Sequence, residues 1–532
     1  MPPRCHLLPL TLLLLASTGL ATPAAAQLRG SVGSAPPVEG SVSAPSTPLT
    51  AQGTLPTLED ETKAQEARRK NRNASRETLS SPNPILNQNT RAQVIRPVRN
   101  AALLRRPANK AVSTRSMPGP AGAAPQAGAL PQVIAPGLTA PPLVKRKKGA
   151  EDDPYAPLGL RLGGLTILPS VDLSAGYDTN PQRTASQAKP KGSRLLQIAP
   201  ALSVTSDWSQ HQVQVDLRGS YNDYLDVRDA NRPSLNGVVS FRGDVSRDAT
   251  LNLQLREVIE SERPGSINLP SSVKGRLLYF DTGLSLGWTQ KFGYAALTAT
   301  GTADRWTYQD GTTRAGAAFS QKDRNYNAYG AKLRGAYELT PGIAPYIEVG
   351  VDTRVYDSKL DVAGYERSSN GLQGKLGSTF ELTRTLTGDV SAGYGTRHYA
   401  DSRLRSLNGP LLDASLIWLA SPLTKVTLKA ATTFTETVQP GSPGALSHSG
   451  SVEVAHDLLR NLTLTGSLAY ARSSYLGLNR TEDSITGGMK LDYKIDRNFV
   501  FRTSYAYERA ISSTPASGYT AHTFLAGLRI QQ

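Results

Sequence analysis

The feature that most limits what this chain can fold into is a long alternation of polar and apolar residues that begins near Arg161. In the segment 212–221 the odd-numbered residues are apolar, aromatic or glycine, and the even-numbered residues are polar. The same alternation recurs in 251–256, 425–434, 462–470 and 489–495. A period of two is that of a β-strand, whose successive side chains point to opposite faces. The C-terminal part of the chain is therefore predicted to be all-β.

The length and spacing of these segments indicate which β architecture is meant. They run for roughly ten to sixteen residues, whereas strands of soluble proteins average about five or six. Short turns are predicted near 208–210, 246–248, 291–292, 341–342, 384–385, 421–423, 458–460 and 496–497. Longer polar loops are predicted near 179–193, 228–232, 263–274, 310–321, 358–367, 401–406, 439–444, 476–479 and 511–517. Turns and loops that alternate in this way predict about eighteen antiparallel strands, an even number that leaves both ends on one side.

Long amphipathic strands with this rhythm are typical of an outer-membrane β-barrel. In lipid every backbone N–H and C=O must be paired internally, so the sheet is expected to close on itself. The apolar face, with Phe434 among its residues, is predicted to meet lipid, and the polar face to meet water in the lumen. A soluble β-sandwich is the alternative, but its strands would be shorter and its second face partly apolar.

Aromatic residues near the predicted strand ends are expected to form girdles at the two membrane interfaces. They are Tyr221, Tyr279, Trp288, Trp306, Tyr308, Tyr356, Tyr399, Trp418, Tyr470 and Tyr507. In the last strand Phe524, Ala526, Leu528 and Ile530 alternate as lipid-facing residues. The chain ends in Gln532 rather than in the aromatic residue that the barrel-assembly machinery, an expected partner, reads in many barrels.

Charged residues on the polar faces are candidates for lining the lumen. They are Asp216, Arg218, Arg256, Glu348, Asp352, Arg354, Lys425, Lys429, Lys490, Asp492 and Arg502. Rings of such groups could set ion selectivity or hold a sugar chain. They could equally pair with one another across neighbouring strands. A mixture of both roles is expected, with pairing the more common.

The first 26 residues resemble a secretory signal peptide. Arg4 supplies positive charge, an apolar run covers 7–15, and Ala24 to Ala26 precede Gln27, so cleavage is predicted between Ala26 and Gln27. A single membrane anchor would need about twenty apolar residues, more than this run contains. The only cysteine, Cys5, lies in this segment, so the mature chain is expected to hold no disulfide and no cysteine-ligated metal.

The segment 27–152 is predicted to be a disordered, basic periplasmic tail rich in proline and alanine, because it has too few apolar residues to offset the entropy of ordering. Of the net charge of +16, most lies here: residues 1–150 hold 19 Lys+Arg and 6 Asp+Glu, and residues 151–532 hold 40 and 37. A nucleic-acid-binding core is therefore not indicated. Basic clusters at 68–72, 105–106 and 145–148 could contact lipid head groups, envelope polysaccharide, peptidoglycan or a partner protein. A solvated linker is the alternative.

The start of the predicted barrel carries a recognisable motif. It reads Asp153-Pro154-Tyr155-Ala156-Pro157-Leu158-Gly159-Leu160-Arg161-Leu162-Gly163, followed by Leu168-Pro169-Ser170 and by Gly176-Tyr177-Asp178-Thr179-Asn180. This opening resembles that of the outer-membrane β-barrel proteins of alphaproteobacteria in the "putative beta-barrel porin 2" family, and later strands match it in pattern. The resemblance covers 153–532. It implies an outer-membrane barrel, in some members associated with envelope polysaccharide export, and it implies no defined substrate.

No arrangement of residues predicts enzymatic chemistry or a cofactor. The histidines after His6 are scattered over different strands and loops, and no zinc-protease, nucleophile-elbow or phosphate-loop motif occurs. His448 beside Ser447 and Ser449 is the nearest approach to a catalytic pair, and chance proximity is the expected explanation.

Taken together, these patterns predict an outer-membrane channel for diffusion of small hydrophilic solutes, because a barrel of about eighteen strands normally encloses an aqueous pore. Two alternatives stay open at this point. One is a channel for polysaccharide export or secretion, and the other is a structural barrel that its own basic tail plugs or anchors.

Overall fold

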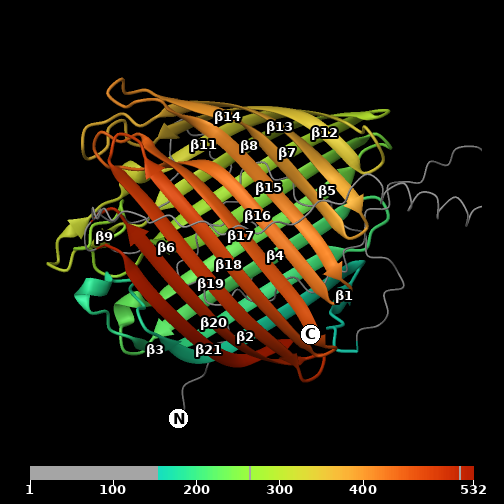
Figure 1. Cartoon of the computed structure of the whole chain (residues 1–532), viewed down its shortest axis with the longest axis horizontal. Helices are drawn as coiled ribbons and strands as arrows, with labels where there is room; N and C mark the ends of the chain where they lie inside the picture. Colours follow the sequence, from blue (N-terminus) through green and yellow to red (C-terminus); the bar gives the residue numbers. More distant parts are fainter. Residues whose placement is uncertain (1–153, 263–264, 515–516) are drawn as a thin grey trace, which may run out of the picture. The chain divides into compact units, whose positions relative to one another are not determined.

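The described part of the chain is a closed antiparallel β-barrel. The computed structural model describes residues 154–532, apart from 263–264 and 515–516. The predicted signal peptide (1–26) and basic tail (27–152) lie outside the described residues. Each barrel strand pairs with its neighbour in sequence, and β2 (Leu165–Asp178) pairs with β21 (Tyr519–Gln531), which closes the sheet. Figure 1 shows the strands inclined to the barrel axis, as closure requires.

Eighteen strands form the barrel wall, in agreement with the sequence-based prediction. Between β2 and β21 these are β3 (Ser193–Ser206), β4 (Gln212–Tyr224), β5 (Arg232–Asp244), β6 (Ala249–Glu262), β7 (Leu277–Phe292), β8 (Ala295–Tyr308), β11 (Tyr326–Tyr337), β12 (Ile343–Tyr356), β13 (Ser369–Thr383), β14 (Leu386–Tyr399), β15 (Leu407–Ser421), β16 (Thr424–Glu436), β17 (Gly444–Leu459), β18 (Leu462–Tyr475), β19 (Arg480–Lys494) and β20 (Phe499–Ser512).

Short elements lie outside the wall. β1 (Leu160–Leu162) forms a hairpin with the start of β2, and β9 (Gly311–Thr312) pairs with β10 (Ala318–Phe319) in the loop between β8 and β11. Three 3-10 turns occur in loops: η1 (Ser186–Ala188), η2 (Arg228–Ala230) and η3 (Lys322–Arg324). Within the described residues, no helix is long and apolar enough to cross a membrane.

The two ends of the barrel differ, as predicted. The eight connections at one end, here called the turn end, have two to five residues each, and the nine at the other, here called the loop end, have four to seventeen. In Figure 1 the C-terminus and β1 mark the turn end, and the β9 label marks the loop end. One predicted turn is displaced: Lys291 and Phe292 belong to β7, and the chain reverses at Gly293, whose φ of +62° suits glycine.

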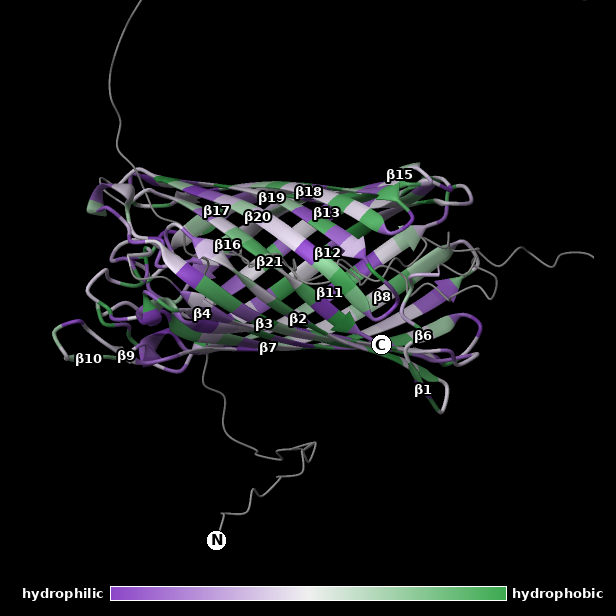
Figure 2. Cartoon of the chain, turned by 90° about the horizontal axis from the view of Figure 1, so that it is seen from below, coloured by the Kyte–Doolittle hydropathy of each residue, from purple (hydrophilic) through white to green (hydrophobic). Residues whose placement is uncertain are grey.

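The two faces of the wall have the predicted polarity. Met489, Tyr493, Leu468 and Ile530 are exposed on the outer face, whereas Lys490 and Arg502 are buried on the inner one. The alternation is visible as hydrophobic and hydrophilic bands along each strand in Figure 2. Arg305 and Asp357 depart from this pattern near the loop end, where they form an ion pair of 2.6 Å on the outer face.

The predicted aromatic girdle is only partly correct. Tyr221, Trp288, Trp418 and Tyr470 are exposed on the outer face, as a girdle requires. Five other members of the predicted set point inward instead: Tyr279, Trp306, Tyr308, Tyr356 and Tyr399. The reason is register, because each stands opposite an inward-facing residue of the next strand, and a shift of one residue reverses the face.

Phe434 is the second correction. Pairing between β15 and β16 stops at Asp413 and Ala431, and beyond this point the end of β16 leaves its neighbour. The ring of Phe434 reaches Gly395 on the inner side of β14, where an added Cβ would lie 2.8 Å from it. The loop-end tips of β16 and β17 therefore lean into the barrel, and Phe434 packs against the inner wall instead of facing lipid.

Buried ion pairs tie together the seam between the first and last strands. Asp172 of β2 accepts hydrogen bonds from Arg529 of β21 (2.7 and 3.0 Å) and from Arg502 of β20 (2.9 Å). The two backbones also come very close, because a Cβ at Gly176 would lie only 1.8 Å from the carbonyl oxygen of Phe524. Glycine is therefore required for the barrel to close at this point.

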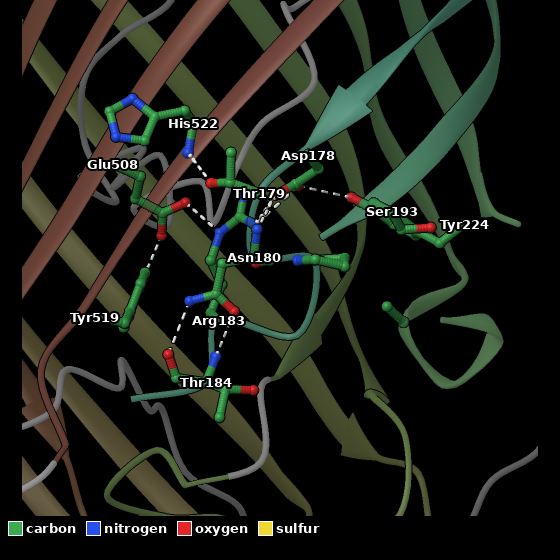
Figure 3. A network of polar contacts seen from close by, with 12 residues as sticks. Asp178, Thr179, Asn180, Arg183, Thr184, Ser193, Tyr224, Glu508, Tyr519 and His522 are labelled. Carbon is green, nitrogen blue, oxygen red and sulfur yellow. Dashed lines mark hydrogen bonds and ion pairs between the residues drawn. The ribbon is translucent and has the colours of Figure 1, made fainter. Parts of the chain in front are cut away.

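A second network ties the loop end of the same seam. Arg183, in the loop after β2, donates to Asp178 of β2 (2.8 Å) and to Glu508 of β20 (2.7 Å), and all three side chains are buried. Figure 3 shows Arg183 between the two carboxylates, with Tyr519 donating to Glu508 from β21. Thr179 and His522 exchange two hydrogen bonds of 2.9 Å across the seam. The seam is thus bridged by side chains at both ends.

The seam network predicts a large effect for Asp172→Asn. The change leaves Arg529 buried without a carboxylate partner, which costs about 3 kcal/mol or more in the free energy of unfolding. We expect a lower midpoint for the heat-induced mobility shift of the folded barrel on detergent gels. Asp216→Asn is the control, since its ion pair with Arg218 is one-third exposed and 3.4 Å long, worth about 1 kcal/mol or less. Equal midpoints for the two variants would contradict this account of the seam.

Candidate functional site

The candidate functional site is the interior of the barrel. Ion pairs join strands that are not adjacent: Arg256 of β6 to Asp304 of β8 (2.9 Å), and Lys375 of β13 to Asp413 of β15 (2.5 Å). Arg334 of β11 reaches Asp389 of β14 across two intervening strands (2.9 Å). Side chains of non-adjacent strands converge in this way only on the concave side of a curved sheet. The polar face therefore lines the inside of the barrel.

The structure places the eleven charged residues singled out from the sequence on this inward face, and eight of them form ion pairs. Arg256 contacts both Asp281 and Asp304, and Lys490 and Arg502 both contact Asp492. The other four of the eight are Asp216, Arg218, Asp352 and Arg354. Because these charges neutralise one another, they contribute little net field to the lumen.

Three of the eleven have no ion pair within the described chain. Glu348 stands opposite Arg334 in the register of β11 and β12 and is nearly buried. Lys425 and Lys429 lie on the inward face of β16, where Lys429 is exposed to the interior opposite Ser415. These two lysines are therefore positive charges that solvent or a solute in the interior can reach.

One loop crosses the interior. The connection between β6 and β7, described from residue 265 to 276, turns inward and reaches the tips of β16 to β18. Ile267 packs with Ala445 and Tyr475, and Thr437 donates to the side chain of Asn268 (3.0 Å). β6 and β16 stand far apart in the strand order, with nine strands between them on one side. The described part of this loop, from 265 onward and here called the crossing loop, therefore spans the interior.

The crossing loop is held firmly at its base. Leu269, Val273 and Leu277 form a buried cluster against Phe319. Lys274 donates from its backbone N–H to Thr312 (2.8 Å), and Arg314 donates likewise to Ser272 (2.8 Å), so the loop continues the small β9–β10 sheet. A loop with a buried apolar cluster and paired backbone is a fixed part of the barrel.

The inward tips of β16 and β17 are held by two buried arginine networks. Glu436 is fully buried and accepts hydrogen bonds from Arg354 and from the hydroxyl of Tyr399 (3.1 Å). Arg367, in the loop after β12, pairs with Asp361 and donates to the backbone of the β16–β17 loop at Ser442 (2.9 Å). Together with the crossing loop, these tips reduce the free cross-section at the loop end.

Aromatic rings form a row on the inner wall across four neighbouring strands, β7, β8, β11 and β12. The ring of Trp306 stacks on Tyr279 (5.9 Å between centroids) and on Tyr326 (5.8 Å). Tyr326 in turn lies 6.3 Å from Tyr356. Trp306 and Tyr326 are buried, so this row strengthens the wall below the loop end.

The Asp178-Thr179-Asn180 motif has a structural role at the loop end. The Asn180 amide donates to Thr184 O (2.8 Å) and accepts from its backbone N–H, which folds the loop after β2 back on itself. This turn places Arg183 between its two carboxylates and exposes the carbonyl oxygen of Pro181 to the interior arginines Arg232 and Arg276. Arg232 and Arg276 were not predicted from the sequence, because they are far from the Asp178-Thr179-Asn180 motif along the chain and no motif of their own marks them.

Ser447 and His448 do not form a catalytic pair in the structure. The Ser447 hydroxyl contacts Ser473 (2.7 Å), whereas His448 Nδ1 contacts the hydroxyl of Thr432 (3.0 Å). Adjacent residues of one strand point to opposite faces, which separates the two groups. Ser449 bonds to the carbonyl oxygen of Ala431 (3.3 Å).

A closed eighteen-stranded barrel with an apolar outside and a charged interior defines an outer-membrane barrel of the porin type. Comparison with protein families agrees: the model described as "Putative beta-barrel porin 2" matches residues 153–532. The chain belongs to this family. No curated protein matches the sequence.

Solved outer-membrane proteins have similar folds at low identity. OccAB3 of Acinetobacter baumannii is 12% identical, with 70% of this chain and 100% of that one covered and a TM-score of 0.36. OccK2 (OpdF) of Pseudomonas aeruginosa, solved with glucuronate, is 10% identical, with 70% and 99% covered and a TM-score of 0.35. The siderophore receptor PiuA of A. baumannii is 9% identical, with 69% and 82% covered and a TM-score of 0.38.

Proposed function

We propose that this barrel is a diffusion channel for small hydrophilic solutes, with its narrowest part at the crossing loop. The observation that carries the proposal is the interior itself, which combines the inward-facing charged residues with the accessible lysines Lys425 and Lys429. Passive diffusion needs only a wet path of sufficient radius and a lining field, and no catalytic chemistry. The crossing loop and the tips of β16 and β17 would set the upper size of the solute.

Polysaccharide export is the second candidate, and the inner-wall aromatic row supports it. Planar rings offer contact surface for sugar rings, and Tyr279 of this row is only partly buried. Export would require the crossing loop to move aside, because a polymer needs a continuous wide passage. The basic segment 27–152 would then face the periplasm and contact the polymer or peptidoglycan.

The experiment that tests the proposal is planar-bilayer conductance of the refolded chain 27–532 and of a shortened chain 153–532. Stable open steps in both forms are expected for a diffusion channel. Steps only in the shortened form would replace the proposal with a gated or export channel. Silence in both would favour a structural barrel that anchors an envelope partner.

A further inference from the structure

Two arginines converge on the carbonyl oxygen of Pro181 at the loop end of the interior, and a third, Arg183, donates to the carbonyl oxygen of the preceding residue, Asn180. Arg232 begins β5 and Arg276 directly precedes β7, and both donate to the carbonyl oxygen of Pro181, at 3.5 and 3.3 Å. Arg183, two residues after this proline, stands at the same loop. Arg232 also donates to Ala230 O, and Arg276 also donates to Ser261 Oγ, so the other acceptors of these two arginines are neutral as well.

The charges of Arg232 and Arg276 are not neutralised by contact. Neither forms an ion pair with any residue of the described chain. Arg232 is only 4% exposed, and its terminal Nη2 is buried without a hydrogen-bond partner. The same holds for Nη2 of Arg183. A buried guanidinium N–H without an acceptor is costly, so such a donor is normally satisfied by an ordered water, an ion or a ligand.

The acidic groups near Arg232 and Arg276 are too few to balance the positive charge of these two arginines. Asp178 and Glu508 are both engaged by Arg183. Glu260 of β6 attracts both Arg232 and Arg276 electrostatically but forms an ion pair with neither. One carboxylate thus faces two guanidinium groups. Burial and the like charges of Arg232 and Arg183 lower the pKa of the Arg276 guanidinium to about 9, so its positive charge is incompletely balanced.

We propose that Arg232 and Arg276, assisted by the free Nη2 of Arg183, bind a small anion carrying a carboxylate or phosphate group. The paired N–H groups of a guanidinium match the two oxygens of a carboxylate or two oxygens of a phosphate. Two guanidinium groups can therefore donate to different oxygens of the same anion. Tyr224, whose ring lies 5.2 Å from the Arg232 guanidinium, forms one side of the site.

The role of this site in transport rests on the proposed function. If the barrel is a diffusion channel, the site makes small anions its preferred solutes. It lies beside the base of the crossing loop, since Arg276 ends that loop. A solute that enters at the loop end would therefore meet the arginines at the level where the passage narrows. Binding at this level would raise the local concentration of anions and favour them over neutral solutes of the same size.

Isothermal titration of the detergent-solubilised mature chain with acetate, succinate and inorganic phosphate tests the site. We expect saturable binding of at least one anion and none of glucose. Tighter binding of succinate would identify a carboxylate site, and tighter binding of phosphate a phosphate site. The double variant Arg232→Gln, Arg276→Gln is expected to bind about tenfold more weakly or worse, because it removes charge-assisted hydrogen bonds. The double variant Arg384→Gln, Arg460→Gln, which removes the same two charges from exposed positions at the turn end, should bind as the unchanged protein does.

The outcomes separate the site from the channel. No anion binding by a correctly folded protein, or equal loss in the Arg384→Gln, Arg460→Gln variant, would overturn the site even if conductance is normal. Anion binding in a protein without conductance would keep the site and overturn the channel. If the double variant does not fold, Arg276→Gln alone serves, since Arg276 is half-buried and accepts substitution more readily.

Discussion

Replacing residues 266–273 by a short Gly-Ser linker is expected to raise the size limit for solute passage substantially. The change removes the segment that carries Ile267 and Asn268 to the opposite wall, together with Leu269 and Val273 of its buried base. Because passage through a pore is limited by its narrowest section, we expect flux of a large sugar to rise by about twofold or more. Swelling of proteoliposomes in neutral sugars of increasing size measures the limit.

Two comparisons make this prediction specific. The pair Asn268→Ala and Gln439→Ala removes hydrogen bonds at the tip of the crossing loop and should give a smaller increase. Val362→Ser alters the β12–β13 loop at a residue that is 85% exposed, and it should leave the limit unchanged. An unchanged limit after the linker replacement would mean that the crossing loop does not form the constriction.

Glu436→Gln is expected to destabilise the barrel and to loosen its loop end. The carboxylate is fully buried, pairs with Arg354, and lies 3.9 Å from Arg397, so the neutral amide leaves two buried guanidinium groups poorly compensated. Breaking such a pair costs about 3 to 5 kcal/mol in the free energy of unfolding. Urea titration of the refolded barrel, followed by tryptophan fluorescence, measures the loss.

The matched control for this prediction is Glu453→Gln. Glu453 lies on β17 in the same hairpin and on the inward face, but it is only half-buried and forms no ion pair within the described residues. Its substitution should cost about 1 kcal/mol or less. Equal losses for the two variants would show that the Glu436 network does not hold the tips of β16 and β17.

The barrel architecture could be predicted from the sequence because its signals are local. The alternation in 489–495 depends only on the period of the strand, and Met489 and Ile495 are exposed as predicted. Turns and loops alternate in length along the chain, so the strand number followed without any knowledge of contacts. The apolar face must meet lipid wherever it occurs, so no partner element had to be identified.

The direction of individual rings could not be predicted as securely. Tyr221 and Tyr279 both lie near strand ends, yet one is exposed on the outer face and the other stacks on Trp306 inside. The face depends on a register that shifts by one residue without changing composition. Phe434 changes sides because β16 leaves β15, an event that depends on packing against Gly395 and has no local sequence signal.

The interior site could not be predicted because its residues are distant in sequence. Arg183 and Arg276 lie in two connections and Arg232 is the first residue of β5, and nothing in the sequence links the three. Only closure of the sheet and the inward turn of two loops bring Arg232 and Arg276 to Pro181, beside Arg183. The inward-facing charged residues of the strands could be predicted from the period of two. Loop residues follow no period, so their direction could not be predicted.

The most direct test of a closed barrel with a wet interior is thiol labelling at two neighbouring positions of β7. Ser285 points inward at mid-strand, and Leu286 beside it is 50% exposed on the outer face. The only cysteine, Cys5, lies in the predicted signal peptide, so single variants Ser285→Cys and Leu286→Cys in the mature chain each carry one thiol. In intact liposomes, a water-soluble, membrane-impermeant maleimide is predicted to label the variant at 285 and to spare the variant at 286. Labelling at 286 with protection at 285 would contradict the account.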